Sequence, residues 1–314
     1  MTISIAFVGV AHWHAPIYRE CLAPLDARVV GGSDLDAAAG AAAAARLELP
    51  FFADADEMLA RTRPDFVFVT PRHDRVLEEL APVLSRRLAF LIEKPMGRTG
   101  AVAREAARLT RATGVYAAPA LPNRLLEIWD RVHALVAADR LGRVMHAGFR
   151  LINGPPGRYR SLHRVPWMLD PEIGGGGALR NLGQHGAAAS ISVASAPIVR
   201  NGYGEAVEDY AAALIGLPDG AAVQLEAGYS WAPSTGGDFE WRIAATGAYL
   251  QQTKGRLVVR LADGGVEELV TAQPSYAPMV ARVLADFAAG AAPFATLEDC
   301  AAAASLIDDI YAAA

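Results

Sequence analysis

Strand-like and helix-like segments alternate through the first 120 residues, and this alternation constrains the fold more than any other feature of the sequence. Short apolar runs occur at 3–8, 28–32, 65–70, 88–92 and 115–118. Helix-forming stretches separate them, at 16–22, 35–48, 73–86 and 101–113. Runs that are apolar at every position are typical of parallel strands covered by helices on both faces. Residues 1–120 are therefore predicted to form a doubly wound α/β domain around a parallel sheet.

The sequence changes character after about residue 120. A helix is expected at 123–138 and a strand at 143–151, and a long irregular segment follows at 153–173. Further strands are expected at 198–204, 208–217, 221–229, 239–246 and 256–261, and helices at 276–289 and 297–312. Asp219-Gly220 is a typical hairpin turn between two of these strands. Residues 121–314 are thus predicted to form a second, α+β domain for substrate binding and oligomerisation, with an open, mostly antiparallel sheet covered by helices.

Composition and charge narrow the possible partners. The formal net charge of -5 gives no basic surface for nucleic acid, and the apolar stretches are too interrupted to cross a membrane. Two cysteines, Cys21 and Cys300, make neither a disulfide framework nor a zinc pattern, which favours a reducing, cytoplasmic location. The open sheet needs a cover for its second face, so a homodimer or homotetramer formed through this sheet is expected.

The turn after the first strand reads Gly9-Val-Ala-His-Trp-His14 and matches the dinucleotide-binding fingerprint in part. Gly9 suits the tight turn, while Ala11 and His14 take the places of the second and third glycines. Asp34 follows the second strand, where a carboxylate accepts hydrogen bonds from ribose hydroxyls and repels a 2′-phosphate. With no arginine next to Asp34 in the sequence, NAD is favoured over NADP. The alternative for Asp34 is a cap of the helix at 35–48.

Lys94 stands between Glu93 and Pro95, directly after the apolar run 88–92. The carboxyl ends of strands in a parallel sheet are where α/β proteins form ligand crevices. An amine at this place is a candidate for moving a proton. The alternative is an exposed lysine whose apolar stem lies over the strand end.

Two later segments carry candidate substrate contacts. The irregular segment contains Tyr159, Arg160, His163 and Trp167, which are able to stack on a sugar ring and to contact hydroxyl or anionic groups, although a solvated loop would look the same. The segment from Gly174 to His185 opens with four glycines, which let the backbone pass close to a ligand, and a helix is predicted from there to about Val193. Asn181 and His185 would face the same side of that helix, where His185 could transfer protons or simply be a core histidine.

Taken together, these motifs resemble those of the Gfo/Idh/MocA oxidoreductase family over essentially the whole chain. The matching segments are the Gly9 turn, Asp34, Thr70-Pro-Arg-His73, Glu93-Lys-Pro95, Asn123-Arg124 and the block from Gly175 to His185. The resemblance implies an NAD-binding Rossmann domain joined to an open-sheet α/β domain. It also implies that Lys94 is the catalytic lysine beside the nicotinamide, with a cis peptide bond to Pro95, and that His185 faces the substrate next to it.

The remaining site residues follow from the same resemblance and from the segments described above. The dinucleotide is expected to contact Gly9, Ala11, His12, Trp13, His14, Asp34, Thr70, Pro71, His73, Glu93 and Lys94. The substrate is expected to contact Arg124, Tyr159, Arg160, His163, Trp167 and Arg180. The positive charges of the arginines at 124, 158, 160, 164 and 180 suggest an anionic substrate. No metal site is predicted, because the histidines at 12, 14, 73 and 185 have no carboxylate at a recognisable spacing.

The chain departs from the family pattern at Asn181, where the family usually has an aspartate, and also at Ala188 and Arg75. An asparagine cannot accept a proton, so any proton relay through residue 181 is lost. The predicted reaction is reversible hydride transfer between NAD and a secondary hydroxyl of a sugar, polyol or sugar acid, with Lys94 as proton acceptor, His185 orienting the same oxygen and Asn181 holding a neighbouring hydroxyl. The alternatives are a non-catalytic sensor of NAD and sugar, and a lyase or hydrolase that uses NAD transiently.

Overall fold

The computed structural model describes residues 2–186, 192–233, 236–271 and 275–314. Its first half is a six-stranded parallel sheet with the strand order β3-β2-β1-β4-β5-β6. These strands are β1 (Ile3–Val8), β2 (Ala27–Ser33), β3 (Phe51–Phe52), β4 (Phe66–Val69), β5 (Ala89–Ile92) and β6 (Ala117–Pro119). The helices between them are α1 (Ala15–Leu22), α2 (Ala37–Arg46), α3 (Ala55–Thr62), α4 (Val76–Ser85) and α5 (Gly100–Thr113). The predicted doubly wound sheet is confirmed.

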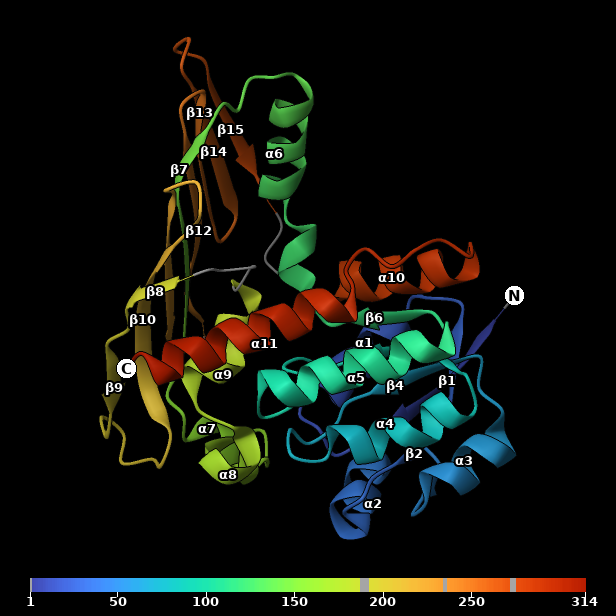
Figure 1. Ribbon diagram of the computed structural model, residues 1–314. Coiled ribbons are helices and arrows are strands. Elements are labelled where there is room, and N and C mark those ends of the chain that lie inside the picture. The colour runs from blue at the N-terminus through green and yellow to red at the C-terminus, as the bar shows by residue number, and fades with distance from the viewer. Residues whose placement is uncertain (1, 187–191, 234–235, 272–274) are drawn as a thin grey trace.

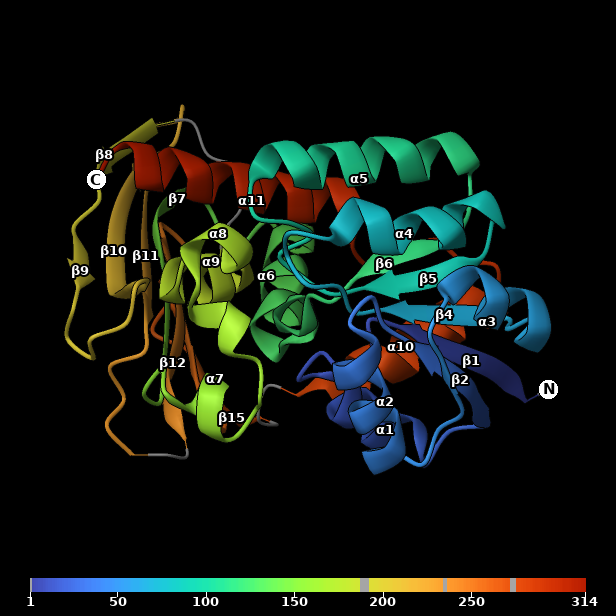
Figure 2. The same ribbon diagram turned by 90° about the horizontal axis from the view of Figure 1, so that it is seen from below.

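Side chains on the two faces of this sheet belong to two separate apolar clusters. One face packs against α1, α2 and the late helix α10 (Tyr276–Ala288), and the other packs against α3, α4, α5 and α11 (Leu297–Ala312). Figure 2 shows these two layers on opposite sides of the strands. Helices from the end of the chain therefore complete both faces of the first sheet.

The second half contains a nine-stranded sheet, counted over the described residues, with the main order β15-β14-β13-β12-β7-β11-β10-β8 and β9 paired to β10. Its strands are β7 (Val144–Asn153), β8 (Ser192–Ser195), β9 (Ile198–Arg200), β10 (Glu208–Gly216), β11 (Ala222–Gly228), β12 (Gly237–Ala245), β13 (Ala248–Thr253), β14 (Arg256–Leu261) and β15 (Val266–Val270). All pairs are antiparallel except β7 with β11, and Asp219-Gly220 lies in the predicted turn between β10 and β11. The mostly antiparallel sheet is confirmed.

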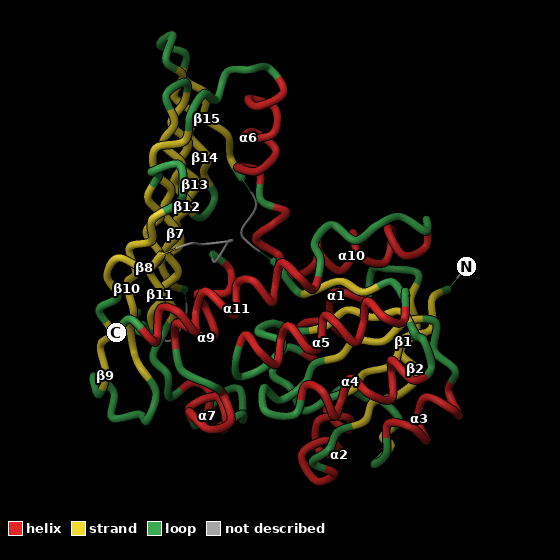
Figure 3. The backbone as a smooth tube through the Cα atoms, viewed as in Figure 1, coloured by secondary structure: helices red, strands yellow, loops and turns green. Residues whose placement is uncertain are grey.

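Helices cover one face of this second sheet. Side chains of α6 (Glu127–Ala137), α9 (Ala178–Leu182) and α11 pack on it, and these helices lie on the side of the first domain (Figures 1 and 3). No described helix covers the opposite face, which carries polar pairs such as Arg150 with Glu240. A short 3-10 helix, η1 (Pro122–Leu125), connects the two halves.

The predicted helix from the glycines to Val193 is wrong in its length. It ends as α9 at Leu182 and continues only as a 3-10 turn, Gly183–His185, while Val193 pairs with Ile215 in the sheet. Glycines at 183 and 186 weaken a helix, and a Cβ at Gly186 would lie 2.1 Å from the Phe149 ring, so the chain passes too close to the sheet for a regular helix. Residues 187–191 of that prediction, including Ala188, lie outside the described residues.

The irregular segment 153–173 contains three single turns: α7 (Arg158–Ser161), the 3-10 helix η2 (Pro166–Leu169) and α8 (Pro171–Gly174). Four further elements were not predicted from the sequence: β3, α3, β13 and β15. Two of these are short or exposed: β3 has two residues, and β15 is exposed at most positions. Their apolar patterns are too weak to predict.

Candidate active site

The carboxyl ends of β1, β4 and β5 meet at one edge of the parallel sheet, and the site is built there. Gly9 follows β1 with a φ of +84°, and a Cβ at this position would lie 2.2 Å from the Thr70 carbonyl oxygen. The Thr70 hydroxyl donates to the Gly9 carbonyl over 2.7 Å. Only glycine fits this turn, and Thr70 fixes the turn against the neighbouring strand.

The Asp34 side chain contacts the first turn and does not cap the start of α2. Its Oδ2 accepts from the Ala11 N–H at 2.8 Å and its Oδ1 from the Asp36 N–H at 2.9 Å. Asp36 is the residue that caps α2, by accepting from the N–H groups of Ala38 and Ala39. Each Asp34 oxygen keeps a second acceptor position, which suits the two hydroxyls of a ribose.

A crevice of about 540 Å³ opens beside Asp34. Its lining includes Ala11, His12, Thr70, Arg72, Arg75, Glu79 and Trp167. Arg72 and Arg75 stand at this crevice although neither is next to Asp34 in sequence, and both are paired: Arg72 with Asp74, and Arg75 with Glu78. These ion pairs reduce the positive charge that a 2′-phosphate would need.

His14, at the third glycine position of the fingerprint, is buried against Glu93. Its Nδ1 lies 2.6 Å from Glu93 Oε1, and the Tyr18 hydroxyl donates to the same oxygen. Burial lowers the pKa of His14 well below its ordinary value and raises the pKa of Glu93. The first turn is thereby joined to the end of β5, one residue before Lys94.

Lys94 is buried and points toward the second domain. Its Nζ donates to the backbone carbonyl of Asn181 at 2.7 Å and to the Asn181 side-chain oxygen at 3.0 Å, and its peptide bond to Pro95 is cis, as the sequence resemblance implied. Burial lowers the pKa of the Lys94 amine. A neutral amine has two N–H groups, and both are occupied by Asn181. Its lone pair is then the position left to take a proton.

Asn181 is held in turn by two buried tyrosines. Its Nδ2 donates to the hydroxyl of Tyr159 at 2.6 Å and to that of Tyr229 at 3.0 Å. Both amide hydrogens are therefore used inside the protein, and none is left for a substrate hydroxyl. Asn181 thus joins the two tyrosines to Lys94, whereas the sequence predicted that it holds a substrate hydroxyl.

Lys94 and His185 line a common pocket of about 290 Å³ between the domains. The other lining residues are Trp13, His14, Ile17, Pro122, Asn123, Leu151, Asn153, Asn181, Leu182, Phe239, Lys254, Ser275 and Tyr276. His185 Nδ1 is buried without a hydrogen-bond partner, and burial lowers the pKa of this ring well below its ordinary value. The neutral His185 ring and the Lys94 amine line the same pocket, an arrangement that suits contact with one substrate oxygen.

The predicted substrate residues divide into two groups. Tyr159, His163 and Trp167 lie over the first turn: Trp13 contacts the rings of Tyr159 and His163, and Trp167 contacts the rings of His12 and His73. His73 also approaches the glycine block, with Nδ1 2.8 Å from the Gly174 carbonyl oxygen. This segment of the second domain therefore covers the crevice where the first domain would hold a dinucleotide.

The structure places the three predicted arginines away from the Lys94 pocket. Arg180 is buried and donates to Asp308 and to the Ala304 carbonyl, so it joins α9 to α11. Arg160 pairs with Glu205 at the surface, and Arg124 lies 3.7 Å from Asp299. The alternation and charge of the sequence could not separate these structural ion pairs from substrate contacts.

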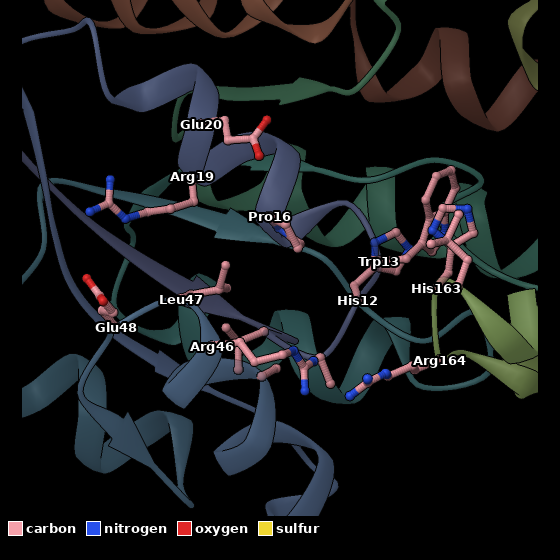
Figure 4. Close-up of a pocket in the computed structure, with 14 residues that line it drawn as sticks. His12, Trp13, Pro16, Arg19, Glu20, Arg46, Leu47, Glu48, His163 and Arg164 are labelled. Atoms are coloured by element: carbon pink, nitrogen blue, oxygen red, sulfur yellow. The ribbon is translucent and has the colours of Figure 1, made fainter. Parts of the chain in front are cut away.

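A larger cavity, of about 590 Å³, lies on the other side of the first turn, between α1, α2 and residues 162–164. Figure 4 shows Arg46 and Arg164 extending toward one another across it. Glu20 and Glu48 line it as well, and neither Lys94 nor His185 does. The residues predicted to be catalytic therefore line the smaller pocket and not this cavity.

Five residues at the two pockets or in contact with the site residues were not predicted from the sequence. They are Tyr18, Glu79, Tyr229, Lys254 and Tyr276. Tyrosines in helices and strands look like core residues, and only the fold brings Lys254 and Tyr276 to the pocket from late in the chain. Over the described part of the chain, no cluster of three or more histidine, cysteine or acidic side chains is placed to hold a metal ion, and no helix there is long and apolar enough to cross a membrane.

Two family models match the sequence. The NAD-binding Rossmann-fold model of the Gfo/Idh/MocA oxidoreductases covers residues 3–120, and the model of the C-terminal domain of the same family covers residues 129–251. The chain belongs to the Gfo/Idh/MocA family. This Gfo/Idh/MocA protein is thus an oxidoreductase with an NAD-binding domain, and the resemblance seen in its motifs is confirmed.

Solved structures share the fold at low sequence identity. GenD2 from gentamicin A biosynthesis, in complex with NAD, superposes with a TM-score of 0.80 at 20% identity, over 99% of this chain and 93% of that chain. Levoglucosan dehydrogenase, in complex with NADH and levoglucosan, gives 0.81 at 16% identity, over 100% and 97%. UDP-N-acetylglucosamine 3-dehydrogenase GnnA from Acidithiobacillus ferrooxidans gives 0.77 at 17%, over 100% and 98%. The sequence matches no curated protein.

Proposed function

We propose that this Gfo/Idh/MocA protein is an NAD-dependent dehydrogenase that oxidises or forms a secondary hydroxyl of a sugar, polyol or sugar acid, with Lys94 as the proton acceptor and donor. The observation that carries the proposal is the Lys94 amine, which is buried in a pocket with both N–H groups of its neutral form bound to Asn181. An amine held in this way presents its lone pair as the free position on nitrogen.

The residues present fit a bound dinucleotide. The Gly9 turn has no room for a side chain, and the Asp34 carboxylate keeps acceptor positions for a ribose. NAD, when bound, supplies the hydride acceptor. We propose that the ribose contacts Asp34 and that the first turn from Gly9 to His14, with Thr70, Pro71, His73 and Glu93, forms the rest of the cofactor site.

Each pocket residue then has a separate task. Lys94 takes the proton of the reacting hydroxyl, since burial lowers its pKa toward the working range of a base. His185, whose Nδ1 has no partner among the described residues, orients the same oxygen. Asn181 positions Lys94, and Trp13 and Phe239 offer apolar surface to a sugar ring.

Lys94→Ala tests this assignment. Positioned proton transfer contributes a factor of ~10²–10⁴ in rate, so we expect turnover to fall by about that factor while NAD binding changes less than about threefold. The assay follows NADH absorbance with NAD and a panel of polyols, aldoses and sugar acids, and NAD binding is measured separately by fluorescence. Wild-type turnover by Lys94→Ala would refute the role of Lys94.

The same panel separates the two alternative functions. A converted sugar without net NADH would indicate transient use of NAD in a lyase or hydrolase reaction, and sugar binding without any conversion would indicate a sensor. We further propose a cytoplasmic homodimer or homotetramer. The free cysteines Cys21 and Cys300 support the location, and the uncovered face of the second sheet supports the assembly.

A further inference from the structure

The chain has 29 lysines and arginines, and only two of them are lysines, Lys94 and Lys254. Both line the same pocket, although 160 positions separate them in sequence. Everywhere else the protein uses arginine as its cationic side chain. A compact primary amine is therefore placed at two points of one cavity, and only the first has a task in the proposed reaction.

Lys254 lies in the turn that follows β13, before Gly255, whose φ is +80°. Its Nζ donates to the carbonyl oxygen of Gly237 at 2.6 Å. An ammonium has three N–H groups, so two are left for a ligand. Partial burial lowers the pKa of Lys254, and the nearby Asp238, whose own carboxylate is paired with Arg150 at 2.9 Å, offsets part of this lowering.

The surroundings of Lys254 suit an anion. Among the described residues, no aspartate or glutamate lines the pocket. Asn153 and Lys254 both line the pocket and both approach Gly237: a Cβ on Gly237 would be 2.8 Å from Asn153 Oδ1 and 3.4 Å from Lys254 Nζ. Of the arginines that the sequence suggested for an anionic group, Arg160 and Arg180 are paired elsewhere. Lys254 thus supplies the positive charge at the pocket mouth.

We propose that Lys254 binds a carboxylate of the substrate, so that the enzyme acts on a sugar acid in preference to a neutral sugar. This inference rests on the proposed dehydrogenase function. A carboxylate carries one negative charge and matches one ammonium, whereas a phosphate carries about -1.5 to -2 and calls for further donors. Asn153, which lines the same pocket, contributes its amide group to the same end of the substrate.

The test compares Lys254→Gln with the wild type on matched pairs of substrates, glucose with glucuronate and galactose with galacturonate. Glutamine keeps a donor for the Gly237 carbonyl and removes the charge. We expect KM for the acids to rise about 10- to 100-fold, the range for losing a hydrogen bond between charged groups, with kcat and the neutral sugars nearly unchanged. Lys254→Arg should recover part of the loss. Arg260→Gln, which removes an exposed charge from β14, is the control and should resemble the wild type.

Binding is measured in parallel, so that a failure of the dehydrogenase assignment can be recognised. With lysine labelled by ¹³C, the protein gives signals from two side chains only, and glucuronate should move the Lys254 signal in the wild type. If no sugar is turned over but glucuronate still shifts this signal, the hydride-transfer proposal fails and the Lys254 proposal stands. An equal rise in KM for acids and neutral sugars would show that Lys254 only holds the Gly237 segment in place, and would overturn the proposal. An unmoved Lys254 signal, or tighter binding of glucose 6-phosphate than of glucuronate, would overturn it as well.

Discussion

Replacing Asn181 by aspartate puts a negative charge where a neutral amide oxygen now lies 3.0 Å from the Lys94 amine. At an effective dielectric constant of about 20, two unit charges at this distance attract by about 5 kcal/mol, which corresponds to about 4 pKa units. Burying the new carboxylate offsets part of this gain, and an opposite charge in proteins typically shifts a pKa by about 1–3 units. We therefore expect the pKa of Lys94 to rise by about 2 units in Asn181→Asp.

The consequence for activity follows from the sign of this shift. Alcohol oxidation needs the neutral amine, and a higher pKa keeps Lys94 protonated to a higher pH. The acidic limb of the profile of kcat/KM against pH should move up by about 2 pH units, with a matching loss of rate at neutral pH. Tyr159 and Tyr229 tolerate the exchange, because a phenol that accepts from an amide can turn its own O–H to donate to a carboxylate.

The shift can be measured without any substrate. A chain with two lysines shows two sets of ¹³C-labelled lysine side-chain signals, and Lys254→Arg assigns them. Asn153→Asp is the matched control, since it makes the same chemical change in the same pocket at the end occupied by Lys254. The reasoning is refuted if Lys94 titrates at the same pH in wild type and Asn181→Asp, or if both aspartate variants shift it equally.

Two further predictions concern stability. Glu79 is buried beneath the Gly9 turn, and its Oε2 has no hydrogen-bond partner among the described residues. Burial raises its pKa well above the ordinary value. Its contribution to stability is therefore present below the unfolded pKa and is lost as the pH rises through the folded pKa. Glu79→Gln should therefore unfold at a higher temperature than wild type, by a margin that widens from pH 5 to pH 8; a constant margin would contradict the titration. Arg180→Met removes a buried guanidinium from Asp308, whose side chain is 35% exposed, and should cost about 2 kcal/mol in urea unfolding, with little change in KM at low temperature. A tenfold rise in KM at unchanged stability would instead indicate that Arg180 contacts the substrate.

The central strands of the first sheet were predictable because β4 is buried at every position and β5 at all but its first, and buried parallel strands are apolar at every position. Lys94 and Asp34 could be placed for the same reason, since each follows such a strand. The sequence pointed to Asn181 but not to its hydrogen bonds, because its partners Tyr159 and Tyr229 come from α7 and from the residue after β11. Hydrogen bonds between distant segments leave no periodic trace in a sequence.

Arg180 and Lys254 illustrate two ways in which the sequence alone misleads about a charged residue. Arg180 lies in a glycine-rich block next to Asn181 and so looked functional, whereas its guanidinium serves the packing of α11. Lys254 lies in an ordinary-looking turn, and only the pairing of β12 with β13 brings it to the pocket. Charge alone could not distinguish a side chain that holds the fold together from one that faces a ligand.

The placement of α10 and α11 on the two faces of the first sheet has a consequence for synthesis of the protein. When the ribosome has completed β6, the strands of that sheet are all present, but Met279, Val283 and Cys300, which cover its two apolar faces, have not yet been made. The apolar faces of the cofactor-binding half therefore stay uncovered until α10 and α11 have been synthesised. We expect ribosome-bound chains that end before α10 to need a chaperone, and to be cut by protease at positions that the finished protein protects.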